Sequence, residues 1–263
     1  MANEPLFLGI DVGSTASKCV IVDADGAMVG HGLAASGAGT EGPKNAVADA
    51  LSSAGTTMDG IAASCATGYG RNLMDWTDGQ MSELSCHAKG AAHLFPGVRT
   101  VIDIGGQDAK VLSISKDGEL ENFVMNDKCA AGTGRFLDVM ASIFGCKVSD
   151  LSGYDERSTE VAPISSTCTV FAESEVISKL AEGVPIPNIV AGIHTSVVER
   201  TAGLARRLGV KQPVVMTGGV ALNARLRQRL ADKLGCEIQT NENSQLVGAL
   251  GAALHAREAH RAS

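Results

Sequence analysis

Two short segments of this chain carry an aspartate, a glycine and a lysine at the same spacing. Residues 10–18 read IDVGSTASK, and residues 102–110 read IDIGGQDAK. Aligned without a gap, the two regions match at Asp11 and Asp103, Gly13 and Gly105, Lys18 and Lys110, Asp25 and Asp117, and Gly26 and Gly118. Each region reads as an apolar strand, an Asp-x-Gly turn, a second strand, an Asp-Gly turn and a third strand. One copy alone would be an ordinary hairpin, but two copies in register indicate a two-lobed ATP-binding fold.

The residue types in these hairpins suit the binding of phosphate and a divalent cation. Backbone N–H groups at a tight turn can surround phosphate oxygens, and a lysine can neutralise them. In the first copy these residues are Gly13, Ser14, Thr15, Ala16, Ser17 and Lys18. Asp11 and Asp103 end apolar strands and are expected to hold Mg²⁺ through water, since Mg²⁺ keeps several waters. Gln107 or Asp108 is expected to orient an attacking water molecule.

Glycine-rich turns elsewhere are expected to bring the backbone close to a nucleotide, because glycine has no side chain in the way. Four of these glycines lie in or after the second hairpin: Gly105, Gly106, Gly132 and Gly134. Residues 214–223 read VVMTGGVALN, a strand that runs into Gly218 and Gly219 and then a helix start near Asn223. That helix start can contact a nucleotide, although an ordinary strand-to-helix turn would look similar. Gln245 either reaches the adenosine or precedes a helix of small residues that packs tightly.

The surrounding sequence supplies the elements that would position these turns. Apolar runs predict strands at 6–11, 18–23, 27–33 and 60–67, three strands between 99 and 126, and strands at 214–217 and 237–239. Helical spacing predicts helices at 43–54 and 82–94, one after residue 134, and helices at 168–180, 189–208, 221–234 and 244–259. Residues 145–163 are polar and read as irregular. The pattern predicts an α/β fold with a mixed sheet in each of two lobes, 1–97 and 98–263, whose last helix can pack back on the first lobe.

Composition narrows the class of protein. The 263 residues are 44% hydrophobic and 19% charged, which is typical of a globular chain. A net charge of −7 and an aromatic content of 3% argue against a nucleic-acid groove. The sequence shows neither a signal peptide nor a membrane span, so we expect a cytoplasmic protein that does not bind membranes. Seven cysteines, an odd number, favour reduced thiols or metal ligands over disulfides.

Two of the cysteines stand where metal ligands are expected. Cys129 and Cys168 are each read as lying just before a helix, where the helix dipole favours a thiolate. Thiolates are the ligands of iron–sulfur clusters, and a 4Fe-4S cluster needs four, so a two-fold dimer with two from each chain is the simplest solution. For these two residues, composition alone is equally compatible with a small buried hydrophobic role. That role is preferred for Cys19, Cys65, Cys146 and Cys236.

Two further groups are weaker candidates. Cys86, His87 and His93 could form a metal site, but adjacent residues point to different faces of a helix, which disfavours it. In the predicted helix 221–234, arginines alternate with a leucine stripe: Arg225, Arg227 and Arg229 with Leu222, Leu226 and Leu230. Such a pattern is most often a core stripe with a solvated basic face. A docking surface for an acidic electron donor is the alternative.

The two hairpins and the glycine turn, in this order, resemble the phosphate 1, phosphate 2 and adenosine elements of the actin, sugar-kinase and heat-shock chaperone ATPase superfamily. This resemblance covers nearly the whole chain and implies a duplicated actin-like (ribonuclease H-like) ATPase fold that binds ATP or ADP in a cleft between lobes. More specific segments resemble the activators of 2-hydroxyacyl-CoA dehydratases, in the BadF/BadG/BcrA/BcrD ATPase family with subunits of benzoyl-CoA reductase. These segments are residues 9–18, 66–72, 81–87, 101–107, 126–140, 164–178 and 215–220.

The family resemblance implies a function. It implies Mg²⁺-dependent ATP hydrolysis coupled to one-electron transfer, by a homodimer whose single oxygen-sensitive 4Fe-4S cluster is held between subunits by Cys129 and Cys168. It implies reduction by ferredoxin or flavodoxin under anaerobic conditions, and delivery of the electron to a 2-hydroxyacyl-CoA dehydratase. Residues 145–160 and the C-terminal tail match the family less well, so a partner preference set there stays open.

Other functions are also compatible with the sequence. A reductase of a double-cubane cluster protein, or a subunit of an aryl-CoA reductase, would carry the same motifs. A small-molecule kinase, such as a sugar kinase, would need a sugar-binding aspartate and would have no use for Cys129 and Cys168. A regulator that uses ATP as a switch, like an actin-like scaffold, would polymerise and hold no iron.

Overall fold

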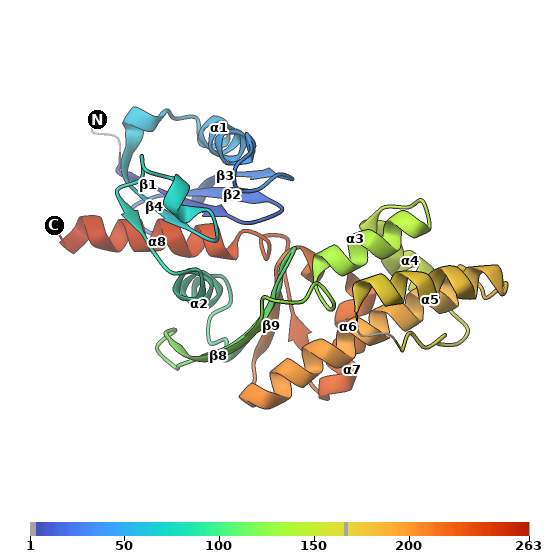
Figure 1. Ribbon diagram of the computed structural model, residues 1–263. Coiled ribbons are helices and arrows are strands. Elements are labelled where there is room, and N and C mark those ends of the chain that lie inside the picture. Colours follow the sequence, from blue (N-terminus) through green and yellow to red (C-terminus); the bar gives the residue numbers. More distant parts are fainter. Residues whose placement is uncertain (1–3, 166–167, 263) are drawn as a thin grey trace. The chain divides into compact units, whose positions relative to one another are not determined.

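The computed structural model describes residues 4–165 and 168–262. The chain divides into two compact units: the first comprises Met1–Val98, Ile114–Leu120 and Gln245–Ser263, and the second comprises Arg99–Ser113 and Glu121–Ser244. Each unit contains one five-stranded mixed sheet flanked by helices, which confirms the expected α/β class (Figure 1). Within the described residues, no helix combines the length and the apolar character needed to cross a membrane.

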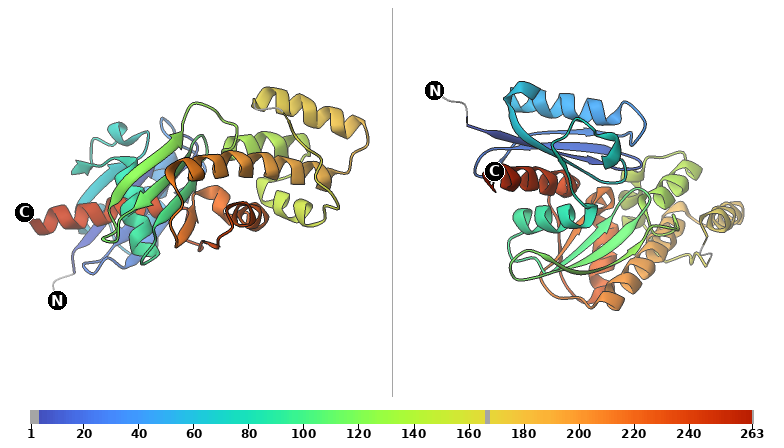
Figure 2. Two further views of the ribbon diagram at one scale, coloured as in Figure 1. Left: turned by 90° about the horizontal axis from the view of Figure 1, so that it is seen from below. Right: turned by 60° about the vertical axis from the view of Figure 1, so that its left-hand side comes forward.

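The first unit is a sheet of order β3-β2-β1-β4-β5 between helices. Its strands are β1 (Leu6–Val12), β2 (Ser17–Val22), β3 (Met28–Ala34), β4 (Ile61–Thr67) and β5 (Gly79–Gln80). Its helices are α1 (Gly42–Ala54), α2 (Glu83–Leu94) and α8 (Val247–Ala262), with short 3-10 turns η1 (Met58–Gly60) and η2 (Arg71–Leu73). Strand β2 is antiparallel to both β1 and β3, whereas β4 runs parallel to β1. Helix α1 covers one face of the sheet and α8 covers the other (Figure 2).

The central strand β1 is buried on both faces, which explains its nearly continuous apolar sequence. Successive side chains of a strand point to opposite faces. Leu8 and Ile10 accordingly belong to the core that includes Ala46 of α1, whereas Phe7 belongs to the core that includes Ala253 of α8. The turn of the first hairpin therefore follows a strand that is packed against helices on both faces.

Close helix packing depends on glycines that leave no room for a side chain. A Cβ at Gly9 of β1 would collide with the backbone of Ala249 and Ala253 in α8. A Cβ at Gly251 of α8 would likewise collide with the backbone of Cys86 in α2. Helix α8 thus lies directly on β1 and α2, so its run of small residues has a packing role.

The second unit is a sheet of order β10-β9-β6-β7-β8 with a set of helices. Its strands are β6 (Thr100–Ile104), β7 (Ala109–Ile114), β8 (Leu120–Asn126), β9 (Val214–Thr217) and β10 (Ile238–Gln239). Its helices are α3 (Gly134–Ile143), α4 (Leu151–Glu156), α5 (Thr169–Ala181), α6 (Ile186–Leu208) and α7 (Ala224–Leu234), with 3-10 turns η3 (Val148–Asp150) and η4 (Gly219–Leu222). Strand β6 pairs antiparallel with β7 and parallel with β9. Its core joins Ile102 and Ile104 of β6 to Phe136 of α3 and Ile193 of α6.

In the second unit, two stretches differ from the sequence-based expectation. Residues 145–163, expected to be irregular, contain η3 and α4, and α4 buries Leu151 in the core. The helix expected at 221–234 is divided into η4 and α7. Asn223 has an extended backbone between them, and its side chain accepts a hydrogen bond from the Leu226 N–H, which caps α7.

The contact at Gly251 predicts the effect of one added methyl group. Gly251→Ala places a Cβ against the backbone of Cys86, so we expect the free energy of unfolding to fall by about 2 kcal/mol, as in overpacked cores. Gly203 in α6 is a matched control, because a Cβ there meets nothing within 4 Å. Gly203→Ala should stabilise by up to about 1 kcal/mol through helix propensity. Urea unfolding followed by circular dichroism measures both, and a stabilising Gly251→Ala would contradict the close packing of α8.

Candidate nucleotide site and metal-binding cysteines

The first Asp-x-Gly turn joins β1 to β2 and is closed by hydrogen bonds. Asp11 lies opposite Lys18 in the antiparallel ladder, and Lys18 Nζ donates to Asp11 Oδ2 at 3.3 Å. The Gly13 N–H donates to the Ala16 carbonyl at 3.1 Å. The predicted phosphate-binding residues thus lie in this turn and in the first two residues of β2: Gly13, Ser14, Thr15, Ala16, Ser17 and Lys18.

Asp11 is 5% exposed, and glycine backbone surrounds its carboxylate. A Cβ at Gly68, where φ is +83°, would collide with Asp11 Oδ1. A Cβ at Gly248 would lie 3.0 Å from both Asp11 Oδ2 and His87 Cε1. Gly68 and Gly248 therefore keep side chains away from this carboxylate. Neither was among the predicted site residues, although Gly68 lies in the motif of residues 66–72.

The second hairpin repeats the Asp–Lys pair but buries it more deeply. Asp103 lies opposite Lys110, with Nζ 3.2 Å from Asp103 Oδ2 and 2.7 Å from Asp108 Oδ2. The Lys110 side chain is 2% exposed, against 17% for Lys18. Lys110 therefore holds two carboxylates in place. Gln107 lies exposed at the tip of this turn.

Asp103 is also fixed from the neighbouring parallel strand. It pairs with Thr217 of β9, and Thr217 Oγ1 donates to Asp103 Oδ1 at 2.7 Å. The next residue, Gly218, has φ +82°, and a Cβ there would collide with the Ile104 carbonyl. Both the positive φ and the close approach require glycine here. Thr217 was not among the predicted site residues. It lies directly before the predicted Gly218 and Gly219, at the end of β9.

Asn223 orders the turn that follows Gly218 and Gly219. Its Oδ1 accepts from the Leu226 N–H at 2.9 Å, and its Nδ2 bonds His194 Nε2 at 3.1 Å. Gly219 is exposed at the same turn, whereas Asn223 is 9% exposed. The Asn223 side chain thus has two partners inside the protein.

The N-terminus of α3 is attached to the second hairpin. The Gly134 N–H donates to the Gly105 carbonyl at 2.8 Å, and the Arg135 N–H donates to the Gly106 carbonyl at 2.7 Å. These bonds satisfy N–H groups that a helix start leaves without a helical partner. Gly132, with φ +88°, lies just before them. The structure therefore gathers the four glycines predicted for the second phosphate element.

Gln245, another predicted nucleotide contact, does not belong to the second unit. It belongs to the first unit, in the turn just before α8, and it is partly buried. The small residues that follow it pack against α2 and β1, as described above.

Five of the seven cysteines are buried or partly buried, and burial raises the pKa of each thiol. Burial raises the pKa to about 12 for Cys19 and Cys86, to about 11 for Cys65, and above its usual value for Cys146 and Cys236. Such thiols stay protonated at neutral pH and are poor nucleophiles and ligands. Cys129 and Cys168 are exposed. The structure thus separates the two predicted ligands from the other cysteines.

The two exposed cysteines have different backbone settings. Cys168 is the N-cap of α5, and its carbonyl accepts from the Ala172 N–H at 2.9 Å. Cys129 lies in the loop between β8 and α3, whose N-cap is Thr133. The expectation that both precede a helix directly is wrong for Cys129, because α3 begins only at Gly134. The helix-dipole argument therefore does not apply to Cys129.

A single chain does not provide a complete metal site in its described part. No group of three or more His, Cys, Asp or Glu side chains there is placed to hold a metal ion. Cys86 is fully buried, and His87 Nδ1 donates to the Glu83 carbonyl at 3.0 Å within α2. The weaker candidate site at Cys86, His87 and His93 therefore gains no support from the structure.

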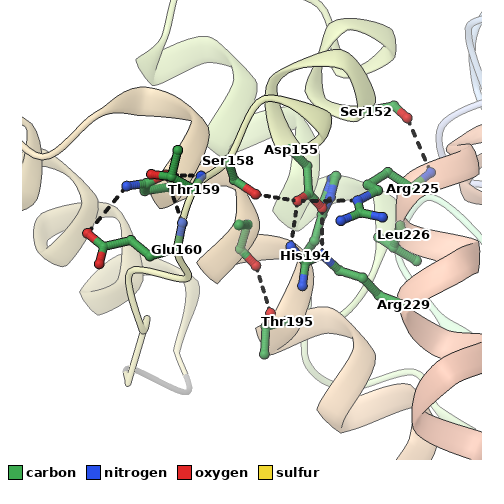
Figure 3. Close-up of polar contacts among 12 residues, drawn as sticks. Ser152, Asp155, Ser158, Thr159, Glu160, His194, Thr195, Arg225, Leu226 and Arg229 are labelled. Atoms are coloured by element: carbon green, nitrogen blue, oxygen red, sulfur yellow. Dashed lines mark hydrogen bonds and ion pairs between the residues drawn. The ribbon is translucent and has the colours of Figure 1, made fainter.

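A buried ionic network in the second unit has no counterpart in the sequence-based predictions. Asp155 of α4 is fully buried and accepts two hydrogen bonds from Arg229, at 2.7 and 2.6 Å (Figure 3). His194 Nδ1 donates to Asp155 Oδ2 at 2.7 Å, and Arg225 Nε lies 3.7 Å from Asp155 Oδ1. Since His194 also bonds Asn223, the network ties α4 and α6 to the start of α7.

This network corrects the interpretation of the arginines on α7. Burial by itself raises the pKa of Asp155, but hydrogen bonds and charge from Arg229 and His194 outweigh it and hold that pKa well below the usual range. Arg229 is therefore an internal counter-ion and does not lie on a solvated basic face. Leu226 and Leu230 are buried as expected, whereas Leu222 is 55% exposed because it lies in η4.

Two mixed sheets, each with an Asp-x-Gly hairpin, and a strand–Gly-Gly turn give this chain the fold class of actin-like ATPases and sugar kinases. A ROK family glucokinase from Streptomyces griseus, solved with glucose and AMPPNP, shares this fold. Its TM-score is 0.54 at 15% identity, over 96% of this chain and 99% of that one. At this level of identity the likeness shows the fold alone.

Within that class, the chain belongs to the BadF/BadG/BcrA/BcrD ATPase family, whose model matches residues 8–256. It is 56% identical over 250 residues to the (R)-2-hydroxyglutaryl-CoA dehydratase activating ATPase of Acidaminococcus fermentans, covering 95% of this chain and 96% of the relative. The crystal structure of component A of that dehydratase, from the same organism, matches with a TM-score of 0.94 and 54% identity, over 98% of this chain and 99% of its own. The predicted family and ATPase class are confirmed.

A second solved relative adds a nucleotide complex. The activator of the 2-hydroxyisocaproyl-CoA dehydratase from Clostridium difficile, solved with bound ADPNP, matches with a TM-score of 0.95 at 49% identity. The match covers 98% of this chain and 96% of that chain.

The Asp155 network predicts a large stability effect. Asp155→Asn leaves Arg229 without its buried counter-charge, so we expect the free energy of unfolding to fall by about 3 kcal/mol at pH 7. Since the folded pKa lies below the unfolded value of about 3.9, the stabilisation is complete above about pH 5 and declines at lower pH. Asp138→Asn, at an exposed position on α3, is the control. Denaturant unfolding between pH 3 and 7 tests this, and equal stability of the two variants at pH 7 would contradict it.

Proposed function

We propose that this chain is the activating ATPase of a 2-hydroxyacyl-CoA dehydratase. It acts as a cytoplasmic, oxygen-sensitive homodimer that couples ATP hydrolysis to one-electron transfer at low potential. The observation that carries the proposal is the exposure of Cys129 and Cys168 in a chain whose other cysteines are buried or partly buried. Relatives at 56% and 51% identity are named as a dehydratase activating ATPase and a dehydratase activator.

The nucleotide is held by backbone turns and two carboxylates. In the first unit, the turn Gly13–Lys18 binds phosphate and Asp11 holds Mg²⁺ through water. The backbone of Gly68 and Gly248 packs against the Asp11 carboxylate and keeps other side chains away from it. In the second unit, Lys110 and Thr217 fix the orientation of Asp103 for the same task. Gln107, exposed at the hairpin tip, orients the attacking water.

Most of the remaining predicted nucleotide contacts are backbone groups of glycines. Gly105 and Gly106 lie at the second hairpin turn, where they accept hydrogen bonds from the start of α3. The other residues proposed to contact nucleotide are Gly132, Gly134, Gly218, Gly219, Asn223 and Gln245. The two internal bonds of Asn223 assign its side chain to shaping the turn, so its contribution to binding is indirect.

The cysteine pair fits half of a 4Fe-4S cluster. Two exposed thiols per chain supply half of the four thiolates, and the second copy supplies the others. When bound, such a cluster supplies one-electron transfer. Cys168 is the N-cap residue of α5, so the start of that helix fixes its backbone. Ferredoxin or flavodoxin is the proposed donor, and the dehydratase, or a related double-cubane or aryl-CoA reductase protein, is the proposed acceptor.

Iron analysis tests the ligand assignment. We expect anaerobically purified protein to be a coloured dimer with about four iron atoms per dimer. Cys129→Ala and Cys168→Ala should each lose most of the iron and keep ATP binding, because neither residue lies in the nucleotide turns. Cys236→Ala, a partly buried thiol elsewhere in the second unit, is the control and should keep its iron. Colourless, monomeric wild-type protein would contradict the proposal, and sugar-dependent ATP turnover would then favour a kinase.

ATP turnover tests the role of Asp11. We expect Asp11→Asn to lower the rate of Mg²⁺-dependent ATP hydrolysis at least about 100-fold, the usual loss for a group that stabilises the transition state electrostatically. Asp49→Asn, exposed on α1 of the same unit, should leave the rate unchanged. Calorimetric titration of nucleotide with and without Mg²⁺ locates the defect, and an unchanged Mg²⁺ dependence in Asp11→Asn would refute the assignment.

A further inference from the structure

One side chain bonds both backbone polar groups of Cys129. Asn126 is the last residue of β8, and its Oδ1 accepts from the Cys129 N–H at 3.3 Å. Its Nδ2 donates to the Cys129 carbonyl at 2.8 Å and lies 3.5 Å from the Ala131 carbonyl. A single asparagine thus spans the loop from the end of a strand. Only a side chain with a donor and an acceptor on the same short stem can make both bonds.

The downstream side of the loop is fixed as well. The buried Thr133 donates to the Ala130 carbonyl through its N–H at 3.0 Å and through Oγ1 at 2.6 Å. Cys129 therefore lies between two anchors, Asn126 before it and Thr133 after it. Thr133 secures the residue next to Cys129, whereas Asn126 bonds Cys129 itself.

The other exposed cysteine is positioned by different means. Cys168 is held by the first turn of α5, whose Ala172 N–H bonds its carbonyl. A helix turn is cooperative, so this bond belongs to a larger set of backbone bonds. The Cys129 N–H and carbonyl instead bond one side chain. The position of Cys129 consequently depends on a residue type, and that of Cys168 on a secondary-structure element.

We propose that Asn126 is a positioning residue that fixes Cys129 for metal binding. The inference rests on the proposed function, in which Cys129 is a cluster ligand. Because the Cys129 N–H donates to Asn126 Oδ1, this N–H is not available to donate to a sulfur atom of the cluster or of its ligands. Hydrogen bonds to cluster or ligand sulfurs change the reduction potential, so Asn126 influences both the retention and the potential of a bound cluster.

The test uses three variants of the full chain. Asn126→Ala removes both bonds. Asn126→Asp is isosteric and keeps an acceptor for the Cys129 N–H, but it turns a carboxylate oxygen toward the Cys129 and Ala131 carbonyls. Asn122→Ala is the matched control, because Asn122 is exposed on the same strand. Among the side-chain hydrogen bonds found in the described residues, its side chain accepts only from the adjacent Phe123 N–H.

Two measurements are made on each variant. In metal-free protein, hydrogen exchange of the segment 127–133 should speed up in Asn126→Ala, with Asn122→Ala and the rest of the chain unchanged. In anaerobically purified protein, iron loss to a chelator should be about tenfold faster in both Asn126 variants, the equivalent of about one net hydrogen bond. The electron paramagnetic resonance spectrum of the reduced protein should also change in the Asn126 variants and not in Asn122→Ala.

The outcomes separate this inference from the proposed function. Wild-type protein without iron contradicts the proposed function, and exchange in the metal-free chain then still decides whether Asn126 orders the loop. Wild-type protein with iron, together with Asn126 variants that exchange and release iron at the wild-type rate, overturns the positioning role. If Asn126→Ala does not fold, as judged by circular dichroism, Asn126→Asp decides the question by the same criteria.

Discussion

The structure depends on an ion pair made across an antiparallel hairpin, once in each unit, partly buried in the first and fully buried in the second. Asp11 pairs with Lys18 and Asp103 pairs with Lys110, each directly opposite the other in the ladder. A one-residue slip of either hairpin would turn the aspartate and the lysine to different faces and leave a charge buried without its partner. The ion pair therefore specifies the register, and the register places the glycine turn at the end of the central strand.

In the second unit, polar contacts extend from that pair to the helices. Thr217 bonds Asp103, and Gly218 lets the chain pass against the carbonyl of β6 and turn into η4. Asn223 then caps α7 and bonds His194, which bonds Asp155. Together, these bonds connect residues at the predicted nucleotide contacts to residues in the helical layer. The turn at Gly218 is therefore fixed by the packing of α4, α6 and α7 as well as by the sheet.

Sequence reasoning succeeded where the signal is local and failed where it is not. The hairpins are short, repeated patterns, so their turns and strand order could be read directly. Asp155 pairs with Arg229, far along the chain, and nothing near either residue indicates it. Arginines at alternate positions on an amphipathic helix read as a solvated face, because the pattern is the same whether a counter-ion covers them or not. Helix α4 was missed because six residues are too few to show a period.

The cysteines also show that sequence patterns do not reveal tertiary contacts. Their exposure depends on tertiary packing, yet the motif around Cys129 and Cys168 separated them from the others before any burial was known. The motif did not reveal how each is held. Gly132 has a positive φ and Thr133 is the N-cap of α3, so α3 begins only at Gly134, five residues after Cys129. A shared cofactor on a two-fold axis would need both sulfur positions to be reproducible in both copies, and a loop cysteine meets that need only if its backbone bonds are satisfied locally. In the proposed dimer, the Cys129 side is therefore the more easily displaced half of the ligand set, since the N–H and carbonyl of Cys129 itself bond one asparagine, whereas the Cys168 carbonyl belongs to a helix turn.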